Sequence, residues 1–273
     1  MIPPIKRVVV PLDAASETAT AIDTAARLAA RWRVPLHGVF VEDEALIGLA
    51  GLSFVDQVVL AGGRQPLTKE HIEDHYRAFA ERARRDLAAA AARHRLEWSF
   101  AVVRGPLVAA AIGEATDDFL VAGASTRPIG GHFRVASPWW PAAATIARPL
   151  LLARRAWETS GSVLTLLRRK SPEAARMLDL AAQIAGFGGG ALTVLAAPDL
   201  AEEEVAAWLA ELLAGHAFDL HTERAASEPA ALRRQILELD CRLLVLEAEA
   251  EDARPDGLRA LVEHLVCDVL ISR

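Results

Sequence analysis

The chain alternates short apolar runs with Ala/Leu-rich stretches of helical length, and it does so twice. The first series extends from Arg7 to Arg154 and the second from Ser162 to Arg273. Each series predicts five strands with a helix between each strand and the next. Continuous apolar strands separated by helices of ten or more residues are typical of parallel sheets covered on both faces. The sequence therefore predicts an α/β protein with two tandem five-stranded parallel sheets.

The length of the chain fits two domains, because 273 residues can form two units that each bury a core of their own. We place the first domain at residues 1–155 and the second at residues 162–273. The segment 156–161 that joins them is short. A linker of this length favours two docked halves, an intramolecular pseudo-dimer, over two loosely connected ones.

Composition and charge exclude several classes of function. No run of about 18 uncharged apolar residues exists to cross a bilayer, and the N-terminus leads into a strand without a signal segment, so we expect no membrane association and a cytoplasmic protein. A net charge of -6 without a basic stripe disfavours nucleic acid as a partner. Cys241 and Cys267 each precede a predicted buried strand, where we expect packed thiols rather than a structural disulfide.

An apolar insert from Ala45 to Pro66 lies between the second strand and the second helix of the first half. It is longer and more apolar than the loops that usually connect such elements. Three interpretations remain open: a short extra helix that seals one sheet edge, a lid over a pocket, or a contact between subunits. The second half has no counterpart of this insert.

In an open parallel sheet, ligands bind beyond the carboxyl ends of the strands, at the point where the strand order reverses. In the first half this point predicts a site formed by Asp13 and by the long loop 123–137. In the second half the equivalent positions are Arg168 and Glu247, so the charge after the first strand is reversed. The acidic stretch that begins at Glu247 repels phosphate. We therefore expect the second half to bind no ligand.

Three segments resemble a known family. They read Val-Val-Val-Pro-Leu-Asp at 8–13, His-Gly-Val-Phe-Val-Glu-Asp at 37–43 and Leu-Val-Ala-Gly-Ala-Ser at 120–125. Together with the order of elements, they are similar to the universal stress protein family in its tandem two-domain form, over nearly the whole chain. The resemblance implies a Rossmann-like sheet of the adenine nucleotide α-hydrolase type, assembly into dimers and no dependable catalytic activity.

Some members of that family bind ATP through a pattern of Gly, two residues, Gly, nine residues, Gly and then Ser or Thr. At this spacing from Gly123 the chain has Thr126, Ala136 and Ser137, so one glycine of three is retained. Glycine lets the backbone approach phosphate oxygens and adopt positive φ values that Thr and Ala resist. The pattern therefore predicts a degenerate nucleotide site, with ATP or AMP as the only cofactor that the resemblance suggests.

Two arginines and a serine offer partial compensation for the missing glycines. Arg127 and Arg134 supply positive charge in the same loop, and Ser137 precedes a proline at a predicted helix start. That start either offers backbone amides to an anion or is capped by Ser137 alone, and a cap is the commoner use.

By the same resemblance, Asp13 lies near the adenine or ribose of a nucleotide and Val41 lines the base pocket. Each residue also has a purely structural interpretation. An aspartate after a strand favours a turn by accepting hydrogen bonds from nearby amides, and a valine fits any buried strand. The two kinds of role are compatible.

No catalytic residue and no metal ligand is predicted. The nucleophile pattern Gly-x-Ser-x-Gly fails after Gly123, because Arg127 occupies the place of the second glycine. Our hypothesis from sequence is a non-enzymatic protein that contacts an unknown protein partner and keeps a crevice for an adenine nucleotide or another small ligand. The alternative is an ATP-binding protein with weak or no ATPase activity.

Overall fold

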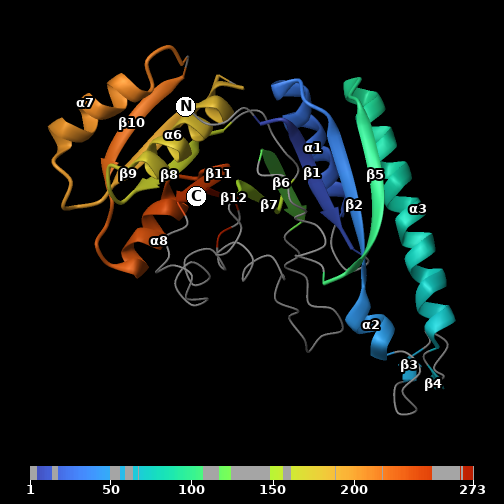
Figure 1. Ribbon diagram of the computed structural model, residues 1–273. Coiled ribbons are helices and arrows are strands. Elements are labelled where there is room, and N and C mark those ends of the chain that lie inside the picture. Colours follow the sequence, from blue (N-terminus) through green and yellow to red (C-terminus); the bar gives the residue numbers. More distant parts are fainter. Residues whose placement is uncertain are drawn as a thin grey trace.

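The structure is a computed structural model that describes residues 5–13, 18–49, 56–58, 64–66, 68–106, 117–123, 148–155, 161–187, 189–216, 218–247, 265 and 267–272. A ten-stranded sheet runs through the molecule in the order β10-β9-β8-β11-β12-β7-β6-β1-β2-β5. The halves of the chain lie side by side along this sheet (Figure 1). The predicted α/β class is confirmed.

The first half contributes β1 (Arg7–Leu12), β2 (Leu36–Asp43), β5 (Trp98–Gly105), β6 (Asp118–Gly123) and β7 (Leu150–Ala153), with helices α1 (Thr18–Trp32) and α3 (Lys69–His94). The second half contributes β8 (Val163–Leu167), β9 (Ala191–Ala196), β10 (Asp219–Arg224), β11 (Leu243–Glu247) and β12 (Asp268–Ser272), with helices α6 (Pro172–Gly186), α7 (Glu202–Leu212) and α8 (Pro229–Glu238). The sequence predicts strands at 7–12 and 36–41 and a helix at about 68–94, and β1, β2 and α3 lie within two residues of these bounds. A further helix, predicted at 106–115, lies almost entirely outside the described residues.

Within each half all strand pairs are parallel, as predicted. The two halves are joined by β12 and β7, which are antiparallel, with Val269 opposite Leu152. The expectation of two separate, wholly parallel sheets is therefore wrong at this joint. A crossover helix fixes the direction of successive strands within a half. No crossover connects β7 to β12, so their relative direction is free to differ.

Buried strand residues alternate between two cores, one on each face of the sheet. Val8, Val10 and Leu12 of β1 pack with α1, α3, α6 and α7 on one face. Val9 belongs to the opposite core, which α8 covers through Ile236. Each core contains strand residues from both halves, so the joint is buried on both sides. The halves are docked, as the short linker predicted.

Local signals explain the long helix α3. Thr68 has an extended backbone and its side chain accepts a hydrogen bond from the backbone N–H of His71, so it caps the helix. The buried positions Ile72, Tyr76, Ala80, Ala83 and Leu87 recur at three and four residues, which is the spacing of one helical face. This face packs on β2, where Gly38 leaves room for Leu87 and Phe100.

The apolar insert begins with the helix α2 (Glu44–Leu49) and includes the antiparallel pair β3 (Asp56–Val58) and β4 (Arg64–Pro66). Ile47 of α2 is buried in the same core as Ile72 and Tyr76. The helix contacts α3 and the edge strand β5, and the segment extends beyond the carboxyl end of β2 (Figure 1). Of the three interpretations, the short extra helix at the sheet edge is the one that the described residues support.

Candidate functional site

The strand order reverses once in each half. In the first half the chain passes from β1 to β2 and β5 on one side, and then to β6 and β7 on the other. In the second half the same reversal lies between β8 and β11. Ligands in open α/β sheets bind beyond the carboxyl ends of the two strands at such a point. The candidate sites are therefore the carboxyl ends of β1 with β6, and of β8 with β11.

Three predicted site residues lie at the first of these points. Asp13 directly follows β1 and is half-buried. Leu12 is paired with Phe40, so Asp13 comes next to Val41 on the neighbouring strand. Gly123 is the buried last residue of β6, the strand on the other side of β1. The structure thus brings Asp13, Val41 and Gly123 to one end of three adjacent strands.

The rest of the predicted site falls on the loop after β6. Thr126, Arg127, Ala136 and Ser137 lie outside the described residues, and so does Arg134. Their roles at the site remain predictions.

Val41 is almost completely buried and belongs to the core on the α8 face, together with Val9 and Ala122. Its structural role as a buried strand residue is therefore established, and a contact with a nucleotide base stays a prediction.

Tyr76 is a residue near the site that the sequence did not single out. It is the only tyrosine of the chain, and its hydroxyl donates to the backbone carbonyl of Asp43 at 3.4 Å. Its ring packs edge-on against Phe40 at 6.2 Å. Burial, followed by the carboxylates of Asp43, Glu42 and Asp13, raises the pKa of its hydroxyl. Tyr76 therefore connects α3 to the end of β2 as a neutral hydrogen-bond donor.

Carboxylates dominate the charge at this edge of the sheet. Asp13, Glu42, Asp43 and Glu44 follow or end β1 and β2. Arg104, at the end of β5, donates from Nε and Nη2 to Glu42 at 3.0 and 2.8 Å and lies 3.6 Å from Glu73. The pKa of Arg104 is raised, mainly by its hydrogen bond to Glu42. Since Arg104 is engaged with carboxylates, the described part of this edge favours hydroxyl and amino groups over phosphate.

The second reversal point contains an ion pair between residues that follow or end its two strands. Glu247, the last residue of β11, is only 7% exposed, and its Oε1 lies 3.4 Å from Nη2 of Arg169, which follows β8. This ion pair connects the ends of the two strands between which a ligand would enter. Sequence reasoning predicted opposite charges here but did not pair Arg169 with Glu247, because 78 residues separate them.

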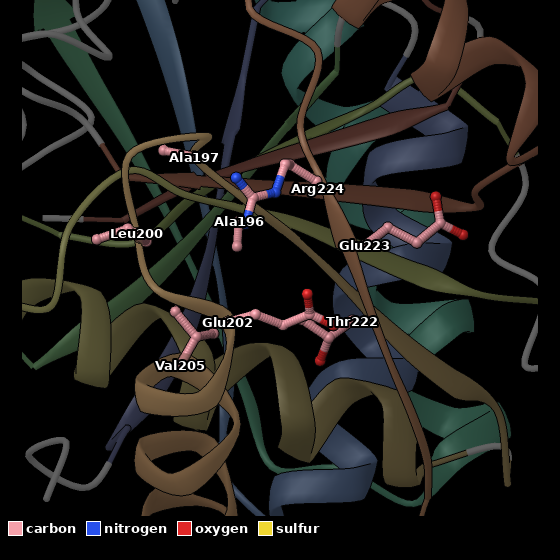
Figure 2. A pocket seen from close by; sticks show the side chains of 8 residues that line it. All are labelled: Ala196, Ala197, Leu200, Glu202, Val205, Thr222, Glu223 and Arg224. Atoms are coloured by element: carbon pink, nitrogen blue, oxygen red, sulfur yellow. The ribbon is translucent and has the colours of Figure 1, made fainter.

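A small pocket lies elsewhere in the second half, at the carboxyl ends of β9 and β10 and the start of α7. Figure 2 shows its lining side chains, which include Ala196, Leu200, Glu202, Thr222 and Arg224. Its volume is about 50 Å³, space for one or two water molecules. Arg224 donates to the carbonyl of Pro198 at 2.8 Å. The pocket is too small for a nucleotide, and the sequence did not predict it.

Two absences among the described residues bear on the chemistry. No group of three or more His, Cys, Asp or Glu side chains there has an arrangement suited to a metal ion. Among the helices formed by these residues, none combines the length and hydropathy that a membrane span requires.

Solved structures share this architecture. A universal stress protein from Archaeoglobus fulgidus DSM 4304 aligns with 97% of this chain and 96% of its own, at 14% identity and a TM-score of 0.65. A protein from Pseudomonas aeruginosa UCBPP-PA14, provisionally described as a universal stress protein, and a functionally unknown protein from Pseudomonas aeruginosa PAO1 each align at 17% identity with a TM-score of 0.61. They cover 98% of this chain and 93% and 92% of their own.

No family model matches the sequence, and no curated protein matches it significantly. The structural likeness extends over nearly the whole length of each pair of chains. It shows that both halves of this chain together adopt the fold of those universal stress proteins.

Proposed function

We propose that this chain is a cytoplasmic regulatory protein without enzymatic activity, which resembles universal stress proteins of the tandem two-domain form. Domain 1–155 keeps a degenerate crevice for a small ligand, and domain 162–273 supports it without binding one. The output of such a protein is contact with a partner protein, through which a stress response is regulated. The fold shared with universal stress proteins supports the general role.

The difference between the two reversal points carries this proposal. One has Asp13 beside Val41 and Gly123, and the other has an ion pair between Arg169 and Glu247. Breaking the contact between Glu247 and Arg169 to admit a ligand removes part of the charge compensation of a buried carboxylate, which is costly. A ligand that enters the second half must displace this ion pair, and this cost is the reason for placing the ligand in the first half.

The acidic edge of the first half argues for a degenerate site rather than an efficient ATP site. A triphosphate that approaches Asp13, Glu42 and Asp43 meets like charge, and Arg104 is already engaged with Glu42. In the rival proposal, an ATP-binding protein with weak or no ATPase activity, Arg127, Arg134 and Ser137 hold the phosphates. The positive charge of the two arginines is the feature that favours this second candidate.

The antiparallel contact of β7 with β12 supports the interpretation of the chain as an intramolecular pseudo-dimer. Two like-built halves meet there edge to edge, as two copies of one subunit do across a twofold axis. The strands β5 and β10 remain at the two edges of the sheet. Because an edge strand can pair with a second copy of the chain, a homodimer is also part of the proposal.

Calorimetric titration with ATP and with AMP, each with and without Mg²⁺, separates the two candidates. The leading proposal expects no heat from ATP at micromolar concentration and no phosphate release above that of buffer. Mass spectrometry of small molecules carried through native purification then shows which ligand the crevice prefers.

Variants make the titration specific. Asp13→Asn tests the first crevice, Ser137→Ala tests the phosphate loop, and Asp199→Asn is the matched control, because Asp199 follows β9 in the second half and is exposed. Micromolar ATP binding that both test variants abolish and the control retains would overturn the leading proposal. Absence of heat up to millimolar ATP would eliminate the rival.

A further inference from the structure

The two cysteines of the chain lie together at the amino ends of neighbouring strands. Cys241 precedes β11 and Cys267 precedes β12, and these strands are parallel with Leu243 opposite Asp268. The backbone N–H of Asp268 donates to the carbonyl of Arg242 at 3.1 Å, which holds the residues before the two strands side by side. Both thiols are free, each is 6% exposed, and they share a hydrogen bond.

The surroundings of the two sulfur atoms differ. Cys267 accepts the shared hydrogen bond, and this bond, followed by the nearby Arg154 guanidinium, lowers the pKa of its thiol. Cys241 donates the bond, and the bond together with burial raises the pKa of its thiol. A thiolate is the reactive form of cysteine. The neighbouring strand ends bring the two thiols together, and the opposite directions of their pKa shifts favour Cys267 as the sulfur that attacks an oxidant.

The pair also adjoins the joint of the two halves. Asp268, next to Cys267, accepts hydrogen bonds on Oδ1 from the backbone N–H groups of Arg154 and Arg155 at 2.7 and 3.2 Å. The Arg154 side chain donates to the carbonyl of Leu265. A covalent change at Cys267 therefore occurs one residue from the contact by which β12 holds the end of β7.

We propose that Cys241 and Cys267 are a site of reversible oxidation, at which a hydroperoxide converts the two thiols into a disulfide that ties β11 to β12 beside this joint. The small exposed fraction of both cysteine residues favours a small oxidant, and hydrogen peroxide is little larger than water. This site is separate from the crevice and does not rest on the function proposed for it.

The chemistry balances with hydrogen peroxide as the two-electron oxidant. The Cys267 thiolate attacks one peroxide oxygen, the O–O bond breaks, and hydroxide leaves and takes up a proton, which produces a sulfenic acid. The Cys241 sulfur then loses its proton and attacks the Cys267 sulfur, and the hydroxyl group leaves as water. Two thiols and one peroxide thereby become one disulfide and two waters. A dithiol reductant returns two electrons and two protons and restores the thiols.

Peptide mapping of the folded, full-length chain after treatment with hydrogen peroxide tests the proposal. Trypsin cleaves after Arg234, Arg242 and Arg259 and releases the peptides 235–242 and 260–273, each with one cysteine. We expect these peptides to be joined, the intact chain to lose two hydrogens, and dithiothreitol to reverse both changes. The disulfide closes a loop of 27 residues, so oxidation should raise the melting temperature by about 5–10 °C.

Serine variants assign the roles of the two thiols. Cys267→Ser should leave Cys241 slow to react, whereas Cys241→Ser should accumulate a sulfenic acid at Cys267 that a dimedone probe captures. Circular dichroism of both variants checks that they fold, and Cys241→Ala replaces the serine variant if it does not. Two thiols that remain free in the folded wild-type chain at peroxide concentrations that oxidise the urea-unfolded chain would overturn the proposal. Disulfides only between chains, or direct conversion to sulfinic acids, would do the same.

Discussion

Trp32, the last residue of α1, packs edge-on against Phe187 directly after α6, with the ring centroids 5.7 Å apart. The same indole lies 4.8 Å from the ring of Phe119 on β6, and the Arg31 guanidinium lies 5.9 Å from the centroid of Phe187. The two halves of the chain therefore contact each other through this aromatic cluster as well as through the sheet.

Trp32→Ala should lower the free energy of unfolding by about 2–4 kcal/mol, because it removes a large, partly buried side chain from between the halves. Trp32→Phe should cost less, since it keeps the ring contacts and removes an Nε1–H group that has no hydrogen-bond partner among the described residues. Urea unfolding measures both values. If both variants lost the same free energy of unfolding, a phenyl ring at position 32 would stabilise the protein no more than a methyl group, which would contradict a contribution from the ring contacts.

Gly38→Ala should destabilise the first half. A Cβ atom at this position lies 2.7 Å from Cδ2 of Leu87 and 2.9 Å from Cδ2 of Phe100, and overpacking of a core costs about 1–3 kcal/mol. Gly48→Ala in α2 is the matched control, because its Cβ meets no atom within 4 Å, and alanine favours the helix by about 0.5–1 kcal/mol. Thermal unfolding should move the two melting temperatures in opposite directions, and a harmless Gly38→Ala would contradict the packing described here.

Asp268→Ala should cost about 2–4 kcal/mol, because two backbone N–H groups at the joint lose their acceptor. Asp268→Asn keeps an acceptor oxygen and should cost much less at neutral pH. Burial raises the pKa of the wild-type carboxyl above its ordinary 3.8, so the folded state binds the proton more tightly than the unfolded state. The free energy of unfolding gained from this proton is complete below pH 3.8, and it is lost as the pH rises through the pKa of Asp268 in the folded state.

Acidification should therefore increase the free energy of unfolding of the wild type relative to that of Asp268→Asn. Unfolding by urea at a series of pH values from 7 to 4 measures this shift. A difference that stays constant over the range would show that the carboxyl titrates alike in the folded and unfolded chains.

His37 should make the wild type less stable as the pH falls below about 6.5. Its Nδ1 lies 2.7 Å from Oγ of Ser99, and burial, followed by the charge of Arg7, lowers the pKa of the ring. The unfolded chain then binds the proton more tightly, so stability is complete above the ordinary value of 6.5 and is lost as the pH falls through it. The ring is half-buried, so solvent screening keeps the effect below about 1 kcal/mol.

His37→Asn should reduce the slope of stability against pH between 7.5 and 5.5, and His75→Asn, on the exposed face of α3, serves as the control substitution. Unfolding by guanidinium at constant ionic strength provides the comparison. If the two variants show the same slope, His37 is not the group that titrates.

Much of this fold could be predicted because its strands are buried on both faces. The runs at residues 8–12 and 243–246 are apolar throughout, which is typical of strands in a sheet that helices cover on both faces. The sequence predicts a helix from about Thr68 to His94, and α3 occupies Lys69–His94. In each case the signal lies within a few residues of the element that it predicts.

The missed features depend on contacts between distant residues. The direction of β12 against β7 is set by packing between the halves, and no loop connects the two strands to reveal it. The pairing of Arg169 with Glu247 depends on the order of β8 and β11 in the sheet. Asp13 and Gly123 could be placed at one edge of the sheet because each lies at the carboxyl end of an apolar run, whereas Val41 is proposed only from the resemblance to universal stress proteins.

Because β12 is antiparallel to β7, the carboxyl ends of the strands in the first half lie at the same edge of the sheet as the amino ends of the strands in the second half. Gly123 is paired with Ala153 on β7, and Leu152 is paired with Val269 on β12, so Ala153 falls beside Asp268. Cys267 and Gly123 thus lie at the same edge of the ten-stranded sheet, two strand spacings or about 10 Å apart. If β12 ran parallel to β7, the proposed oxidation site and the proposed ligand crevice would lie at opposite edges of the sheet.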